Sequence, residues 1–260
     1  MKKKISLSII TTMLFSTVVM AETITTTDVE AKYSAKSTVE KSTELKQNIN
    51  LGFANTTGNT EILNINAKYN LAYTYNDTLN VGFDSSLFLT ENDNVKDNEE
   101  YRANLGLEQL ISNGWLGYAS LGWLKNEFLN YDNKMAIGLG IGKELLNSEQ
   151  HSLKVKLGVA QNIEEYSNDQ EKEEYTSLNE YIEYNNQLNK ISKLFVKVGA
   201  LENFDDFNND YEVLGAFGVN FAVAENLSLS VEEEIHYDKL PPVGFEKTDT
   251  KSIVRLGYNF

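Results

Sequence analysis

The residues most capable of chemistry are few, because the sequence has two histidines and no cysteine. His236 follows Glu232 and Glu234 at intervals of two residues. Side chains at this spacing point to the same face of a β-strand, so an imidazole and two carboxylates would meet there. Such a group could bind a metal or transfer a proton. A strand face lined with paired charges has the same spacing, and we expect a structural role for these residues.

Two other patterns resemble enzyme motifs but lack the geometry. His151 and Ser152 are adjacent, so on a strand their side chains point to opposite faces and the histidine cannot activate the serine. The glycines of Gly138–Gly142 resemble a dinucleotide-binding loop, but no helix follows them. We expect them instead on a crowded strand face. The sequence therefore predicts no catalytic residue, no cofactor, no metal centre and no enzyme activity.

The N-terminal segment predicts export. Three lysines after Met1 precede an apolar run that reaches Met20, which is typical of a Sec signal peptide over residues 1–21, cleaved after Ala21. Residues 22–42 are polar and lack a period, so we expect a flexible periplasmic leader. The whole chain has a formal net charge of −15, which argues against nucleic acid as a partner, because phosphates bind to basic surfaces.

From residue 43 onward the chain alternates between apolar and polar residues. The clearest segment has an apolar residue at every odd position from Leu63 to Tyr75. A period of two predicts β-strands with one apolar face. Segments with the same alternation lie near residues 48–53, 79–84, 101–108, 135–142, 153–160, 194–200, 213–221, 227–236 and 253–260. Two more strands, over 115–125 and 176–188, have apolar residues on both faces, so either face could be the apolar one.

The connections between these segments alternate in length. We expect tight turns near residues 76–77, 112–114, 147–150, 188–190 and 224–226. We expect longer loops over 91–100, 126–132, 164–174, 202–210 and 238–246, with a short first loop at 56–59. Short periplasmic turns and longer outer loops are typical of bacterial outer-membrane barrels. The sequence thus predicts an all-β fold over residues 43–260, a transmembrane antiparallel β-barrel of about twelve strands. The alternative is a secreted, soluble β-protein.

Two further patterns resemble those of known outer-membrane proteins. Val254, Leu256, Tyr258 and Phe260 alternate at the end of the chain, which resembles the signal recognised by the barrel-assembly machinery. Residues 52–61, 136–142 and 153–158 resemble hairpins of the salt-induced outer-membrane protein family, and the resemblance covers residues 43–260. It implies a barrel in the cell outer membrane with a link to salt or osmotic stress, and it brings no catalytic residues.

The predicted inner face of the barrel mixes both charges and leaves the role of the lumen open. It could be a narrow solute channel, in which basic residues attract anions, or a closed, salt-bridged support of the envelope. A third hypothesis is a surface-binding or adhesion barrel, whose acidic outer loops hold divalent cations and contact lipopolysaccharide. The partners expected are outer-membrane lipid, lipopolysaccharide and the assembly machinery. The lumen-lining candidates are Lys68, Arg102, Lys154, Lys156, Glu232, Glu234, His236 and Arg255.

Overall fold

The computed structural model describes residues 44–57, 62–92, 95–126, 130–168, 170–241 and 246–260. The predicted signal peptide (1–21) and leader (22–42) lie outside these residues. The described chain forms twelve strands: β1 Lys46–Thr57, β2 Ile62–Tyr75, β3 Leu79–Asn92, β4 Val95–Ser112, β5 Trp115–Asn126, β6 Tyr131–Asn147, β7 His151–Tyr166, β8 Glu173–Asn189, β9 Ser192–Asn203, β10 Tyr211–Ala224, β11 Leu227–Asp238 and β12 Thr248–Asn259. The described residues include no helix long and apolar enough to cross a membrane.

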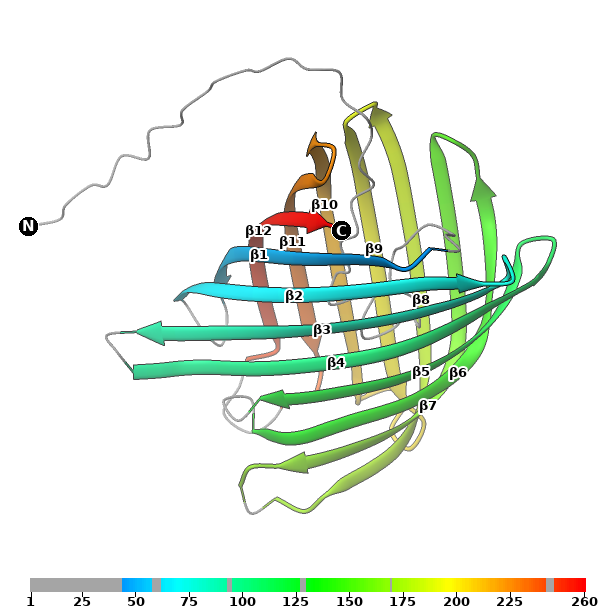
Figure 1. Cartoon of the computed structure of the whole chain (residues 1–260). Helices are drawn as coiled ribbons and strands as arrows, with labels where there is room; N and C mark the ends of the chain where they lie inside the picture. The colour runs from blue at the N-terminus through cyan, green and yellow to red at the C-terminus, as the bar shows by residue number, and fades with distance from the viewer. Residues whose placement is uncertain (1–43, 58–61, 93–94, 127–129, 169, 242–245) are drawn as a thin grey trace, which may run out of the picture.

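The strands form one closed antiparallel barrel (Figure 1). Each strand pairs with its neighbours in sequence, and β1 pairs with β12 to complete the ring, for example through Leu51 and Leu256. The backbone N–H of Phe260 adds a hydrogen bond to the carbonyl oxygen of Gln47, at 3.1 Å. This confirms the predicted fold class, including the number of strands.

The exterior of the barrel is apolar and its interior is mainly polar, with small apolar clusters such as that of Phe195, Leu201 and Leu214. On β6 the outward side chains of Ile137, Leu139 and Ile141 are 54 to 63 % exposed. On the inner face of β1 and β2, Asn48 and Asn70 are fully buried. A soluble protein buries its large aliphatic side chains and exposes its amides. The observed distribution is that of a barrel surrounded by lipid.

Tight turns close one end of the barrel. The β2–β3 turn has Asn76 and Asp77 at positive φ, and the β4–β5 turn has Asn113 and Gly114 there. Two successive residues at positive φ are typical of type I′ turns, which match the twist of paired strands. The connections at the opposite end, called the outer end below, include six residues between β7 and β8 (167–172), seven between β9 and β10 (204–210) and nine between β11 and β12 (239–247).

The prediction of one long loop is wrong. Residues 91–100 are predicted to be one of the longer outer loops, but β3 continues to Asn92 and β4 begins at Val95. Charged residues are compatible with a strand that extends beyond the lipid, since neighbouring strands still satisfy the backbone. The strand register also shows which face points inward on the two strands whose faces the sequence left open, β5 and β8. On β5 Leu116 and Tyr118 face inward, and on β8 Tyr181 and Glu183 face inward.

Aromatic side chains mark both edges of the apolar exterior. Trp115, Tyr75 and Tyr258 are exposed near the tight-turn end. Tyr211 and Tyr237 pack together near the outer end, with ring centroids 5.9 Å apart. Such belts lie at the two membrane–water interfaces.

The carboxylates of Glu180 and Glu233 interrupt the apolar exterior of the described strands. Glu233 of β11 lies between Val231 and Ile235 and accepts a hydrogen bond from Ser252 at 2.5 Å.

Glu180 of β8 lies between Leu178 and Ile182 and is paired with Leu157 of β7 and Ala200 of β9. Its side chain is exposed on the outside of the barrel. It makes no hydrogen bond or ion pair with the part of the chain that the structure describes. A lipid-facing carboxylate is costly in a membrane barrel, although less so than a lysine or arginine.

Candidate functional site

The structure places all eight lumen-lining candidates on the inner face of the barrel. They come from five strands, β2, β4, β7, β11 and β12, so the basic residues do not form one wall. Most of these side chains are buried, for example Lys68 at 5 % exposure, Lys156 at 4 % and Glu234 at 2 %. His236 is the most open, with one third of its side chain exposed.

Several of the basic candidates contact a carboxylate directly. Arg255 of β12 donates to Glu232 on the adjacent β11. Arg102 donates to Glu100 two residues away on the same strand, at 2.6 Å. The inner face therefore carries alternating, neutralised charge, and not the uncompensated basic surface that would favour anions on its own.

A second set of ion pairs joins β4, β6 and β7, and two of its contacts link strands that are not neighbours. Glu108 of β4 accepts from Lys154 and Lys156 of β7, at 3.2 and 2.8 Å. Glu144 of β6 lies 3.7 Å from Lys154. We call these four residues the lower cluster, because they lie toward the tight-turn end. Their side chains extend along the wall past β5 and β6, where Gly142 leaves room: a Cβ there would lie 2.9 Å from Cγ of Lys156.

A third set of contacts crosses the lumen near the outer end. The Nζ atom of Lys134 on β6 lies 2.5 Å from Glu164 of β7 and 3.3 Å from Glu212 of β10. Tyr166 and Tyr175 each donate a hydroxyl hydrogen bond to Glu164, at 2.9 and 2.8 Å. We call these five residues the outer cluster. Since β6 and β10 are separated by three strands in the sheet, the Lys134–Glu212 contact spans part of the lumen.

His236 belongs to this outer region and not to a site with its own strand neighbours. Its Nε2 atom lies 3.1 Å from Glu212 of β10, whereas Glu232 is held by Arg255. The possible metal or proton-transfer set of Glu232, Glu234 and His236 therefore does not form. Within the described ranges no group of three or more histidine, aspartate or glutamate side chains is placed to hold a metal ion. Divalent cations at the outer loops stay a prediction.

The largest inner side chains lie flat against the wall. The ring of Tyr118 from β5 covers Gly140 and Gly158, where an added Cβ would lie 2.7 and 2.9 Å from ring atoms. Phe195 of β9 covers Gly218 of β10 in the same way, at 2.7 Å. This explains the inner-face glycines predicted from the Gly138–Gly142 run.

His151 lies at the tight-turn end, outside the lumen. Its Nδ1 atom is 2.9 Å from the hydroxyl of Tyr184, and the two rings stack. This contact, and the contacts of Lys134 and Glu212, were not found from the sequence. Lys134 and Glu212 are 78 residues apart, and only the complete strand register brings them together.

Residues 49–260 match a family of proteins of unknown function, DUF481. The chain belongs to this family. The match covers nearly all of the barrel and carries no description related to salt. A search of curated proteins gives no match.

Solved structures with the same fold are outer-membrane barrels. The NanC porin is 5 % identical, with a TM-score of 0.57 over 81 % of this chain and 98 % of that chain. The translocator domain of the autotransporter NalP from Neisseria meningitidis is 12 % identical, with a TM-score of 0.53 over 85 % and 90 %. An outer membrane channel from Pseudomonas putida F1 is 10 % identical, with a TM-score of 0.53 over 83 % and 95 %. At these identities the likeness concerns the fold alone.

Proposed function

We propose that this protein is a non-enzymatic channel of narrow bore in the cell outer membrane. The observation that carries the proposal is the inner face, where buried polar and charged side chains outnumber apolar ones inside an apolar exterior. This face includes an apolar cluster formed by β8, β9 and β10, which consists of Tyr181, Phe195, Leu201, Leu214 and Ala216. The flat packing of Tyr118 and Phe195 over glycines supports it, because rings held against the wall leave the axis to smaller groups. A purely structural barrel has no need of this arrangement.

The outer cluster is the proposed constriction. Lys134 reaches from β6 to Glu212 on β10 and is 11 % exposed in its side chain. Charged side chains at a constriction set both the size and the charge of the solutes that pass. Removing the lysine side chain would open the bridge on one side of the lumen while leaving every strand intact.

Single-channel recording tests the proposal. Refolded protein in a planar lipid bilayer is expected to give small, discrete current steps. Lys134→Ala is expected to increase the conductance by about two-fold or more, because the bridge across the lumen is lost. Lys172→Ala is the control, because Lys172 contacts Glu174 and Glu165 in the β7–β8 loop, outside the lumen. Folded protein that gives no current, with or without Lys134, would exclude the channel.

A response to salt follows from the same cluster and forms part of the proposal. Ion pairs are screened as ionic strength rises, buried pairs less than exposed ones, and the Debye length falls from about 8 Å at physiological salt to about 3 Å at 1 M. The Lys134–Glu212 bridge would weaken in concentrated salt, and the constriction would widen. Conductance normalised to that of the bulk solution is then expected to rise with salt in the wild type and to stay constant in Lys134→Ala.

The location and partners are proposed on the same basis. Export by the signal peptide over residues 1–21 and contact with outer-membrane lipid and lipopolysaccharide agree with the apolar exterior. The predicted assembly signal lies on β12 and the residue that follows it. Its side chains are 47 to 55 % exposed on the outside of the barrel: Val254, Leu256, Tyr258 and Phe260. In this position the barrel-assembly machinery could reach them from the lipid side.

A further inference from the structure

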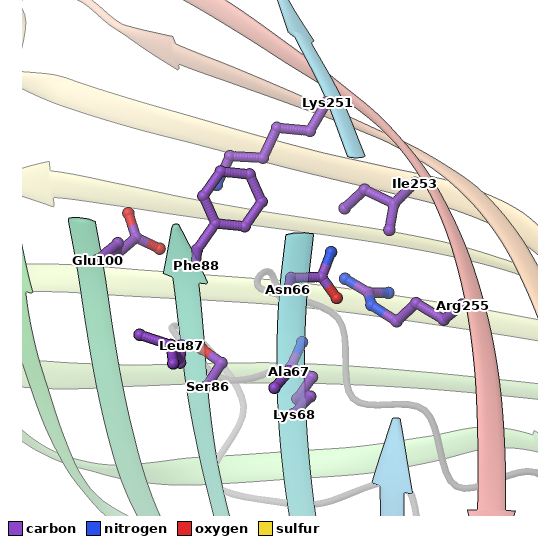
Figure 2. A pocket seen from close by; sticks show the side chains of 10 residues that line it. All are labelled: Asn66, Ala67, Lys68, Ser86, Leu87, Phe88, Glu100, Lys251, Ile253 and Arg255. Carbon is purple, nitrogen blue, oxygen red and sulfur yellow. The ribbon is translucent and has the colours of Figure 1, made fainter. Parts of the chain in front are cut away.

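A small recess opens in the inner wall between β12, β2, β3 and β4. Its volume is about 20 Å³, enough for one water molecule or one solute group of that size. Figure 2 shows its side chains, with the amide of Asn66 and the guanidinium of Arg255 pointing toward one another. The recess is lined by Asn66, Ala67, Lys68, Ser86, Leu87, Phe88, Glu100, Lys251, Ile253 and Arg255.

The amide of Asn66 is the exceptional group. The residue is only 6 % exposed, and neither its Nδ2 nor its Oδ1 atom has a hydrogen-bond partner in the protein. Buried polar side chains are almost always paired, so an amide that lacks partners at both ends indicates a missing molecule. The absent group must accept a hydrogen bond from Nδ2 and donate one to Oδ1. A hydroxyl does both.

The charges around Asn66 favour an anion. Lys68, Lys251 and Arg255 line the recess together with one carboxylate, that of Glu100. Arg255 is fixed by its contact with Glu232. These cationic side chains also contact other groups of the protein, and they are the donors beside the recess that a solute carboxylate would reach.

An apolar surface closes the far side of the recess. Phe88 of β3 packs with Ile253 of β12, and both side chains are buried. The Nζ atom of Lys251 lies 5.0 Å from the centroid of the Phe88 ring, which holds the ring in place. The carbon chain of a solute could rest on this surface while its polar groups face Asn66 and the cations.

We propose that the recess is a binding subsite for hydroxylated organic anions, the class of hydroxy acids and sugar acids. A hydroxyl enters the recess and pairs with the Asn66 amide, and the carboxylate stays in the lumen near Lys68 and Arg255. The remainder of the solute extends along the axis, because the recess admits one group at a time. The inference deepens the proposed channel by naming a solute class, and it rests on that proposal for the route through the membrane.

Binding can be measured without conduction. Saturation-transfer NMR on the barrel in lipid nanodiscs would use gluconate, which has hydroxyls and a carboxylate. Sorbitol has hydroxyls only, and butyrate has a carboxylate only. Gluconate is expected to bind more tightly than either. Asn66→Leu removes the amide at similar volume and is expected to weaken gluconate binding by about three- to tenfold, the loss of one or two hydrogen bonds.

Asn220→Leu is the matched control. Asn220 is another buried inner-face asparagine with an unpaired Oδ1 atom, but it lies on β10, away from the recess. It is expected to leave gluconate binding unchanged, and heat-dependent gel mobility would show that both variants fold. Equal binding by wild type and Asn66→Leu, or equal binding of gluconate and sorbitol, overturns the subsite. Binding without current would remove the channel and leave the subsite standing.

Discussion

At the scale of single residues, glycine on the inner wall is a packing requirement. A Cβ at Gly158 would lie 2.6 Å from the carbonyl oxygen of Leu139 and 2.9 Å from the Tyr118 ring. Gly117 faces outward, and a Cβ there would meet nothing closer than 4.0 Å. The same substitution should therefore have opposite consequences at the two positions.

Gly158→Ala is expected to destabilise the barrel by about 1–3 kcal/mol, because the backbone of β6 cannot move away. Gly117→Ala should be neutral or slightly stabilising, since alanine loses less backbone entropy than glycine. Thermal unfolding in detergent, followed by circular dichroism, would measure both. Equal unfolding temperatures for the two variants would contradict the packing argument.

The lipid-facing carboxylate of Glu180 gives a second prediction at this scale. Because it has no partner among the described residues, its removal loses no contact and ends an unfavourable exposure to lipid. Glu180→Leu is expected to stabilise the barrel in bilayers by roughly 1 kcal/mol. Urea unfolding in lipid vesicles would measure the difference. Glu174→Leu is the control, because Glu174 pairs with Lys172 at the outer rim, at 2.8 Å. A destabilised Glu180→Leu would instead indicate that the carboxylate has a partner in the membrane.

At the scale of elements, the β9–β10 connection has its own pH dependence. Asp210 accepts a hydrogen bond from Asn203 at 2.7 Å, and its own N–H donates to Asp206 at 2.9 Å. Burial raises the pKa of the Asp210 carboxyl, against the lowering effect of the bond from Asn203. A raised pKa means that the folded loop holds the proton more tightly than the unfolded chain. The contribution to stability is thus present in acid and is lost as pH rises through the raised pKa.

Asp210→Asn keeps an acceptor for Asn203 and removes the charge. It is expected to raise the unfolding temperature at about pH 7.5 and to have no effect at about pH 3, where the aspartate is protonated. Circular dichroism melting curves at both values would test this. Asp205→Asn, at an exposed position in the same loop, should leave the unfolding temperature unchanged at both pH values. A gain of stability that is equal at both values would show that the charge of Asp210 is not its cause.

Strand faces show what the sequence could predict at this scale. Where one face is purely apolar, as from Leu63 to Tyr75, the period of two gave the strand and its direction. The period of two does not assign an inner face to β5, because both faces carry apolar or aromatic residues. Leu116 and Tyr118 point inward, and Trp115 and Trp123 point outward. Inward apolar residues there cover glycines on β6 and β7, and such partners are visible only once the strands are paired.

At the scale of the whole molecule, the Lys134–Glu212 contact requires β6 and β10 to approach across the lumen. The native chain has no cysteine, so introduced cysteines react alone. Lys134→Cys combined with Glu212→Cys is expected to crosslink efficiently with a short bis-maleimide and to shift the mobility of the denatured protein. Lys134→Cys with Lys193→Cys should not crosslink, because Lys193 lies at the tight-turn end of β9. Equal crosslinking of both cysteine pairs would contradict the close approach of β6 and β10 at the outer cluster.

The sequence could not predict this contact or the recess at Asn66. Lys134 and Glu164 lay in or beside expected loops, and nothing local distinguishes Asn66 from the other inner asparagines. Both features depend on residues brought together by closure of the ring, with Asn66 on β2 and Arg255 on β12. The fold can be predicted from the local alternation of apolar and polar residues, whereas the candidate site depends on the strand register of the whole barrel.

The pairing of β1 with β12 also constrains how the molecule is made. Before that seam forms, two strand edges expose unpaired N–H and C=O groups, and inside lipid neither edge can be satisfied by water. A chain halted before β12 would leave β11 as such an edge and would be prone to join the edge of another copy. We therefore expect assembly to be all-or-none, because β12 both presents the outward residues of the proposed assembly signal and closes the ring by pairing with β1.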